Sequence, residues 1–401
     1  MKVYFYHTQD IQMILQRMEK GEFPPHFLYG ATKLKDYDID VVWHKSRLGL
    51  PRWRMMLRNA WQILSCKEHF DAIYATHYRG IELVVLLRAL GLFRKPIVIW
   101  HHQPIITPKA SWREWLGRLF YRGFDHMFFF SQKLIDDSLK SSKARPERMH
   151  LGHWGMDTTP NQAPAPIPGF ASPSPVMGKG VDTPSDSAPS ENQGISTPLP
   201  RAGKGKSPQG EGKGAGRLFI SSGKEMRDMP TLIKAFNKTG ARLDVYISKQ
   251  NGEMNYNDIF KGIEIKDNIH VNWVTQLMPY ELQQKVKEAD CVVICCEETK
   301  YTVGLTTVVE ALALGKPIIC SRNPQIPVDF DKEGCGISVP YYDVDGWINA
   351  INYIASHPEE AREMGQRGLE LASTTYNDIR CAREAAEVIK EACKVKIIEK
   401  R

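Results

Sequence analysis

Short apolar runs alternate with amphipathic helical patterns in both halves of the chain. Runs of about four to six residues rich in Val, Ile and aromatic side chains predict buried strands, and apolar residues spaced three and four apart predict helices. In the first half, strands are expected at Val3–Tyr6, Val41–Trp43, Ala72–Ala75, Ile97–Trp100 and Met127–Phe130, with a helix at Ile81–Leu90.

The second half repeats the alternation without repeating the sequence. Strands are expected at Leu218–Ser221, Arg242–Ile247, Ile269–Trp273, Cys291–Cys295 and Pro317–Cys320. Helices are expected at Met229–Asn237, Pro279–Ala289, Thr306–Leu314, Val344–Ser356 and Tyr376–Lys396. This order predicts an α/β fold of two doubly wound, Rossmann-like units with parallel sheets. In such sheets ligands bind beyond the carboxyl ends of the strands.

The pattern is interrupted between residues 158 and 216, where Pro, Ser, Gly, Ala and Lys dominate and Phe170 is the one aromatic residue. Such a segment buries too little apolar surface to offset its ordering entropy. We therefore predict a disordered linker or insertion at 158–216. It separates a first domain at 1–157 from a second domain at 217–375, and a C-terminal helix at 376–401 is expected to pack back towards the first domain.

Composition narrows the class of protein. The 401 residues are 42% hydrophobic and 25% charged, as expected for a globular protein of two domains. No apolar run reaches the length of a membrane-spanning helix, and the N-terminus reads as a strand rather than a signal peptide. The eight cysteines show neither CxxC pairs nor zinc-ligand spacing, which favours a reducing, cytoplasmic location.

Charge is concentrated in the first half. Residues 1–157 contain 24 Lys and Arg against 15 Asp and Glu, whereas the remainder contains 29 against 31. A basic first half indicates an anionic substrate or surface there. No nucleic-acid-binding module accompanies the charge, so nucleic acid is not the expected partner.

The segment after the strand Cys291–Cys295 carries the main candidate site. Gly304 precedes Thr306 and Thr307, which are expected to open a helix that continues through Glu310. A helix N-terminus presents unpaired N–H groups and the positive end of a dipole, and both favour a diphosphate. Thr306 can cap that end, and Glu310 can accept hydrogen bonds from ribose hydroxyls. The alternative is an ordinary capped helix with a solvent-facing glutamate.

A second loop, after the strand Leu218–Ser221, supports the first. Gly223 turns the chain, and Lys224 and Arg227 stand before the next helix. Two cations there suit a negatively charged diphosphate leaving group, and arginine can bind it bidentately. Taken singly, each cation also fits a solvated surface charge.

The segments SGKEMRDMPTLIKAF, IHVNWVTQLMPYELQQKVKEADCVVI and GLTTVVEALALGKPII, followed by GCGISVPYYDVDGWINAI and EEAREMGQRG, resemble the donor domain of retaining GT-B glycosyltransferases of family four, also called glycosyl transferases group one. The similarity covers residues 217–375. It implies two Rossmann-like domains facing a cleft. It also implies that Glu310 binds the donor ribose, and that Lys224 and Arg227 hold the diphosphate with the main-chain N–H groups of Thr306 and Thr307.

One position departs from the family. Its members usually have two glutamates separated by seven residues, and the first falls here on Thr302. Glu297 and Glu298 lie a few residues upstream and are candidates to replace the missing carboxylate.

The first half resembles the family's acceptor domain more loosely, through DAIYATHYRGIELVVLLRALG, KPIVIWHHQP, FFFSQKLIDDSLK and LGHWGMD. The resemblance implies a histidine near the donor sugar after the fourth strand, and register favours His101 over His102; the alternative is a hydrogen-bonded loop histidine. We expect a structural role for His77. Asp36, Asp38 and Asp40 precede a strand, and GT-B enzymes bind the diphosphate without a metal, so no metal site and no cofactor besides the nucleotide-sugar co-substrate are expected.

Two stretches, 45–64 and 109–124, carry the basic excess, and in the second the aromatic and apolar residues recur at helical spacing. In the second, Trp112, Trp115 and Phe120 alternate with Arg113 and Arg118. Aromatic residues and cations on one amphipathic helix suit an anionic membrane surface. The alternative is a core-packing helix with a solvated basic face.

The sequence thus predicts a retaining, metal-independent glycosyltransferase that moves a sugar from a nucleoside diphosphate sugar to a glycan or lipid-linked acceptor. We expect it to act in cell-envelope polysaccharide or glycolipid synthesis, in the cytoplasm or at the inner face of the cytoplasmic membrane. The alternatives are a nucleotide-sugar epimerase and a catalytically silent relative that binds nucleotide or scaffolds a complex.

Overall fold

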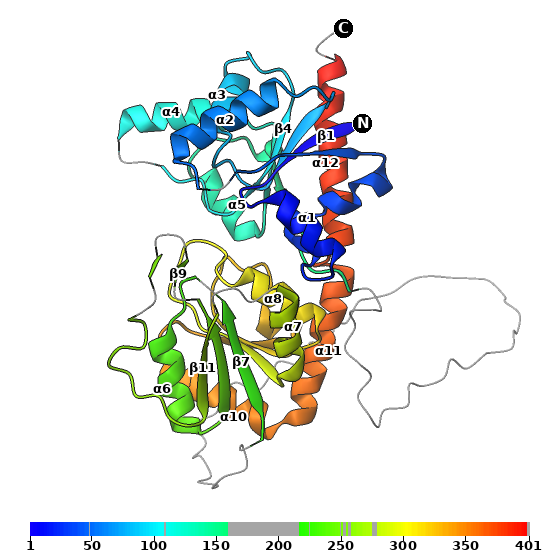
Figure 1. Ribbon diagram of the computed structural model, residues 1–401. Helices are drawn as coiled ribbons and strands as arrows, with labels where there is room; N and C mark the ends of the chain where they lie inside the picture. Colours follow the sequence, from blue (N-terminus) through cyan, green and yellow to red (C-terminus); the bar gives the residue numbers. More distant parts are fainter. Residues whose placement is uncertain are drawn as a thin grey trace, which may run out of the picture. The chain divides into compact units, whose positions relative to one another are not determined.

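The computed structural model describes residues 1–47, 49–107, 110–158, 216–223, 225–248, 250–251, 254–255, 258–274 and 279–398. Except for its two end residues, the predicted linker at 158–216 lies outside them. The described residues form two six-stranded parallel sheets and a small antiparallel pair of strands, β9 (Gln250–Asn251) and β10 (Met254–Asn255). The predicted fold class is confirmed (Figure 1).

The first sheet has the strand order β2-β1-β3-β4-β5-β6. Its strands are β1 (Lys2–Tyr6), β2 (Asp40–Trp43), β3 (Ala72–Ala75), β4 (Ile97–His101), β5 (His126–Phe129) and β6 (Met149–Leu151). The five predicted strands are present within about one residue at each end, and β6 was not predicted. Every residue of β3, β4 and β5 is buried, as expected for parallel strands covered on both faces.

The helices around the first sheet are α1 (Ile11–Glu19), α2 (Arg52–Leu64), α3 (Glu82–Ala89), α4 (Ser111–Tyr121) and α5 (Gln132–Leu139). Short 3₁₀ turns occur at η1 (Pro25–Leu28), η2 (Ala31–Tyr37) and η3 (Pro146–Arg148). Residues 25–37 were not assigned a structure from the sequence, because short 3₁₀ turns lack the long periodic pattern that reveals a helix.

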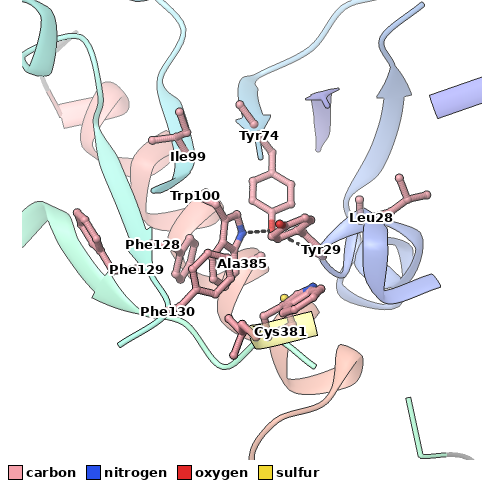
Figure 2. Packing of buried hydrophobic residues seen from close by; sticks show 14 of the residues in the cluster. Leu28, Tyr29, Tyr74, Ile99, Trp100, Phe128, Phe129, Phe130, Cys381 and Ala385 are labelled. Carbon is pink, nitrogen blue, oxygen red and sulfur yellow. Dashed lines mark hydrogen bonds between the residues drawn. The ribbon is translucent and has the colours of Figure 1, made fainter. Parts of the chain in front are cut away.

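An aromatic cluster fills the core of the first domain (Figure 2). The indole N–H of Trp100 donates to the Tyr74 hydroxyl at 2.7 Å, and that hydroxyl donates to the Tyr29 carbonyl at 2.7 Å. These bonds satisfy the polar atoms that the buried rings bring into the core. Trp100 also stacks on Phe128, with ring centroids 4.9 Å apart.

The long C-terminal helix α12 (Asp378–Ile398) belongs to this same core. Its Cys381 and Ala385 lie beside the aromatic cluster of Figure 2. The helix also packs closely on η2, where a Cβ placed on Gly30 would lie 2.6 Å from the backbone nitrogen of Ala382. Glu384 accepts hydrogen bonds from the backbone N–H of His153 at 2.9 Å and joins its Nδ1 at 2.8 Å. The last helix of the chain therefore completes the first domain.

The second sheet has the order β11-β8-β7-β12-β13-β14, with all neighbouring pairs parallel. Its strands are β7 (Leu218–Gly223), β8 (Arg242–Ile247), β11 (Ile269–Trp273), β12 (Cys291–Ile294), β13 (Ile318–Ser321) and β14 (Gly336–Val339). Its helices are α6 (Met229–Thr239), α7 (Pro279–Glu288), α8 (Leu305–Ala313), α9 (Phe330–Glu333), α10 (Val344–Ser356) and α11 (Pro358–Thr374). β14 and α11 were not predicted as elements.

We predict that Gly30→Ala weakens the packing of α12 and lowers the stability of the protein. Gly30 and Gly91 have nearly equal positive φ angles, 74° and 75°, but a Cβ on Gly91 meets nothing within 4 Å. Both substitutions cost about 1–2 kcal/mol for the left-handed backbone, and Gly30→Ala adds about 1–3 kcal/mol of overpacking against Ala382. Thermal unfolding should therefore give a clearly lower midpoint for Gly30→Ala than for Gly91→Ala; equal midpoints would contradict the described packing.

Candidate functional site

The strand order of the second sheet reverses between β7 and β12. β7 is the first strand of this sheet in sequence, and the strands that follow it lie on one side until β12 begins the other side. The carboxyl ends of two strands at such a switch point diverge into a crevice where ligands bind. The two loops singled out from the sequence leave the sheet at this point.

The loop after β12 leads into the N-terminus of α8. Gly304 is the N-cap, with φ +85°, and no side chain among the described residues caps the helix. A Cβ on Gly304 would lie 2.7 Å from Cγ2 of Ile294, so the position requires glycine. The expectation that Thr306 caps the helix was wrong, because α8 begins at Leu305 and Thr306 lies in its first turn. The first-turn N–H groups are therefore left for a ligand.

Thr306 and Thr307 differ in their surroundings. Thr306 is partly exposed, whereas Thr307 is buried and its hydroxyl donates to the Ser222 carbonyl at 3.4 Å. That bond joins the start of α8 to the end of β7. The helix start is thus held against the neighbouring strand without a side chain occupying its free N–H groups.

Arg227 links the two loops from the buried side. Its Nη1 donates to the Glu225 carbonyl at 2.8 Å and to Sγ of Cys296 at 3.4 Å, and its Nη2 donates to the Ser222 carbonyl at 3.0 Å. The side chain is only 3% exposed, and its Nε has no hydrogen-bond partner among the described residues. A guanidinium has five N–H groups, so Nε and one N–H of Nη2 have no partner among the described residues.

Gly223, the last residue of β7, makes room for this guanidinium. A Cβ at Gly223 would lie 1.9 Å from Nη2 of Arg227, and the φ of +141° also disfavours other residues. The alternative reading of Arg227 as a solvated surface charge is wrong, since the side chain is buried. Lys224 lies outside the described residues, so its place in the diphosphate site stays a prediction.

Glu310 lies further along α8 and is 6% exposed. Gln283 Nε2 donates to its Oε1 at 3.1 Å, and Nε2 of His26 lies 3.5 Å from the same oxygen. The alternative of a solvent-facing glutamate is therefore wrong. Sequence reasoning missed both neighbours, because Gln283 sits in an ordinary amphipathic helix and His26 in an unassigned 3₁₀ turn.

The position of the missing glutamate is partly buried. Thr302 lies two residues before Gly304, and the loop before it is fastened by its main chain: Glu297 N–H donates to the Met226 carbonyl at 2.9 Å. Glu298 N–H donates to the Tyr342 hydroxyl at 3.2 Å. The side chains of Glu297 and Glu298 are both exposed. Whether either replaces the absent carboxylate stays a hypothesis.

His101 and His102 have different neighbours. His101 is 4% exposed and its ring stacks on Phe129, with centroids 5.4 Å apart. Its Nδ1 donates to the Gln103 carbonyl at 2.9 Å, and Nε2 has no partner among the described residues. Burial lowers the pKa of His101 to about 4, so the imidazole is neutral at pH 7.

His102 is less buried, and its Nε2 donates to the Thr76 carbonyl at 2.9 Å. Its ring lies 5.6 Å from that of His77, whose pKa burial lowers to about 3. The role predicted for His101 near the donor sugar is not tested by this arrangement.

The three aspartates at 36, 38 and 40 are exposed at the start of β2. Within the part of the chain that the structure describes, no group of three or more His, Cys, Asp or Glu side chains is placed to hold a metal ion. No described helix is both long enough and apolar enough to cross a membrane.

The second half of the chain matches the model of a known protein family. Residues 215–371 match the model of the family "Glycosyl transferases group 1". A D-inositol 3-phosphate glycosyltransferase from Saccharomonospora viridis is 31% identical over 105 residues, which are 23% of this chain and 24% of that relative. The match therefore spans about a quarter of that relative's length.

Solved structures cover nearly the whole chain. HepE from Anabaena, crystallised with UDP, matches with a TM-score of 0.60 at 13% identity, over 98% of this chain and 100% of that one. Sucrose-phosphate synthase from Thermosynechococcus elongatus matches with a TM-score of 0.63 at 13% identity, over 97% and 98%. A glycosyltransferase from Rickettsia africae gives 0.63 at 12% identity, over 98% of each chain.

These similarities agree with the two parallel sheets. At these identities the structural matches speak to the fold, and the family match speaks to residues 215–371. Residues 215–371 of this chain are accordingly similar to the glycosyl transferases group 1 family, and its two parallel-sheet domains have the GT-B fold.

Proposed function

We propose that this glycosyltransferase takes its sugar from a nucleoside diphosphate sugar whose diphosphate lies at the N-terminus of α8. The observation that carries the proposal is the uncapped start of α8 beside the buried Arg227 at the switch point of the second sheet. Free main-chain N–H groups, the helix dipole and an unpaired guanidinium N–H all favour one ligand, an anion with several oxygens.

The nucleoside is placed by the carboxylate of Glu310. Ribose hydroxyls are hydrogen-bond donors, and a buried carboxylate with free lone pairs accepts from them. Gln283 Nε2 holds Oε1 at 3.1 Å, which fixes the orientation of the group. HepE is described in complex with UDP and with UDP-glucose, which makes UDP the first nucleotide to test here.

Transfer forms a bond from the acceptor oxygen to the anomeric carbon and breaks the bond from that carbon to the β-phosphate oxygen. Negative charge grows on the leaving diphosphate, where Arg227, Lys224 and the α8 N–H groups stabilise it. The acceptor proton leaves with the nucleoside diphosphate. No protein nucleophile and no metal are invoked, and attack on the face that the leaving group occupied gives retention. His101, neutral at pH 7, is proposed to lie near the donor sugar.

The acceptor is proposed to be a glycan or a lipid-linked saccharide of the cell envelope, met at the inner face of the cytoplasmic membrane. Support comes from the excess of cations in residues 1–157 and from the exposed basic helices α2 and α4. This charge attracts anionic lipid or a phosphate-containing acceptor.

We predict that the protein turns over at least one donor in a panel of UDP-, GDP- and ADP-sugars when it is incubated with membrane extract. The measurement is the release of the nucleoside diphosphate. A sugar joined to an acceptor supports transfer. Tight nucleotide binding without release with any acceptor would favour the silent relative. An altered sugar configuration on an intact nucleotide would instead indicate the epimerase.

Glu310→Gln should weaken UDP binding about tenfold to a hundredfold, because hydrogen bonds to a charged acceptor contribute about 1.5–3 kcal/mol. Isothermal titration calorimetry measures the dissociation constant. Glu288→Gln is the matched control, since Glu288 is an exposed glutamate near the end of α7. An unchanged constant for Glu310→Gln would remove Glu310 from the ribose site.

Arg227→Lys should reduce the preference for UDP over UMP about tenfold, because lysine cannot keep the loop bonds and also offer a planar N–H to the diphosphate. Comparing the two ligands separates this role from a purely structural one. If the substitution merely distorts the loops, UDP and UMP will weaken equally, and the diphosphate role fails.

A further inference from the structure

An apolar groove crosses the outer face of the first domain. Its cavity volume is about 820 Å³, and residues of α2, α3 and α4 line it. The helix α3 packs against both α2 and α4, and Figure 1 shows these three helices in the first domain. Its lining is dominated by apolar side chains, among them Met56, Leu83, Leu86, Trp112, Leu116 and Phe120. We call this the α2–α4 groove.

Large, solvent-exposed aromatic side chains lie on the helices α2 and α4 that form the α2–α4 groove. Trp53 and Trp61 of α2 are 57% and 71% exposed, and Trp112 and Trp115 of α4 are 64% and 67% exposed. Leu57, Leu64 and Leu116 add further exposed apolar surface. Contiguous exposed apolar surface of this kind marks a binding site for a partner or a membrane. Tryptophan is enriched where hydrocarbon meets water and head groups.

Arginine side chains lie beside these exposed rings, and few carboxylates are near enough to neutralise the arginines. Arg54 and Arg113 lie over the rings of Trp53 and Trp112, at 5.0 and 5.2 Å from the centroids. The two nearby carboxylates are already paired: Glu82 with Arg52, and Glu114 with both Arg118 and Lys143. The surface is therefore positively charged around an apolar channel. A phospholipid has the complementary pattern, an anionic head and an apolar chain.

The inner end of the α2–α4 groove reaches the edge where the first sheet carries its histidines. Tyr78 and Tyr121 line the groove, and their rings lie 5.7 and 5.6 Å from the ring of His101. Tyr78 also lies 4.7 Å from His77. The groove thus ends at Tyr78 and Tyr121, which pack against His101 at the carboxyl end of β4.

We propose that the α2–α4 groove holds the hydrocarbon chain of a membrane-embedded, lipid-linked saccharide acceptor that carries an anionic phosphate, with its head group directed towards the end of β4. The identification of this lipid as the acceptor rests on the proposed function. The tryptophans of α2 and α4 lie at the membrane interface, and the arginines contact phosphate groups. A second copy of this chain is a poorer occupant, because a symmetric contact would bring two surfaces with the same surplus of arginine together.

Dodecyl phosphate, kept below its micelle concentration, is the probe for the groove. Leu86→Trp fills the channel from its α3 side, whereas Leu90→Trp adds the same ring at an exposed position outside the lining. Calorimetry should show dodecyl phosphate binding about tenfold weaker to Leu86→Trp, the effect of losing about two buried methylene groups, and unchanged binding to Leu90→Trp. Equal affinities for the two variants, or no binding to the wild-type protein, would overturn the proposal.

Sedimentation with vesicles of phosphatidylglycerol and phosphatidylcholine tests the surface around the groove. The double variant Trp112→Ala/Trp115→Ala should leave much more protein in the supernatant than the wild type. Unaltered sedimentation, or a concentration-dependent dimer that the same variant abolishes, would overturn the membrane assignment in favour of a protein contact.

UDP titration of each variant keeps this proposal separate from the donor site. The groove variants should bind UDP as the wild type does, because α2, α3 and α4 lie outside the second sheet's loops. Failure of UDP to bind wild-type protein defeats the donor proposal alone. Loss of UDP binding in Leu86→Trp, with wild-type binding intact, would contradict an independent lipid site.

Discussion

The free main-chain N–H groups at the start of α8 are the feature on which the proposed donor site of the second domain depends. No side chain caps them, and Gly304 brings the backbone in at φ +85° where a Cβ would strike Ile294. Gly223 is required for a different reason, because a Cβ there would strike the guanidinium of Arg227. Both glycines therefore serve close approach at the carboxyl edge of the sheet, and an anion is the ligand that such an edge accepts.

Positive and negative groups lie at different places along this edge, as the proposed binding of a nucleoside diphosphate requires. Arg227 and the helix start present positive groups, and Glu310 presents a carboxylate oriented by Gln283 further along the same helix. In the first domain, burial lowers the pKa of His101 to about 4, so a neutral imidazole faces the aromatic end of the α2–α4 groove. Charge on the first domain comes instead from the arginines of exposed helices.

Much of the fold followed from the pattern of apolar residues. The strands Arg242–Ile247 and Ile269–Trp273 and the helix Val344–Ser356 were predicted to the residue, since each has a strong period and clear breaks. β6 and β14 were missed because they are partly buried edge strands without a continuous apolar run. Glu310 and Arg227 were chosen from their place after two strands and from the family resemblance. Their burial and the neighbours His26 and Gln283 depend on tertiary contacts, which sequence spacing does not reveal. The same is true of the uncapped start of α8.

A crystal structure with UDP bound would test the central claim most directly. The account predicts diphosphate oxygens within hydrogen-bond distance of the main-chain N–H groups at Leu305–Thr307 and of Nε of Arg227, with the ribose hydroxyls on the Glu310 carboxylate. It would also show which group stands where the family has its first glutamate, next to Thr302. UDP bound elsewhere, with the α8 N–H groups left to water, would contradict the account.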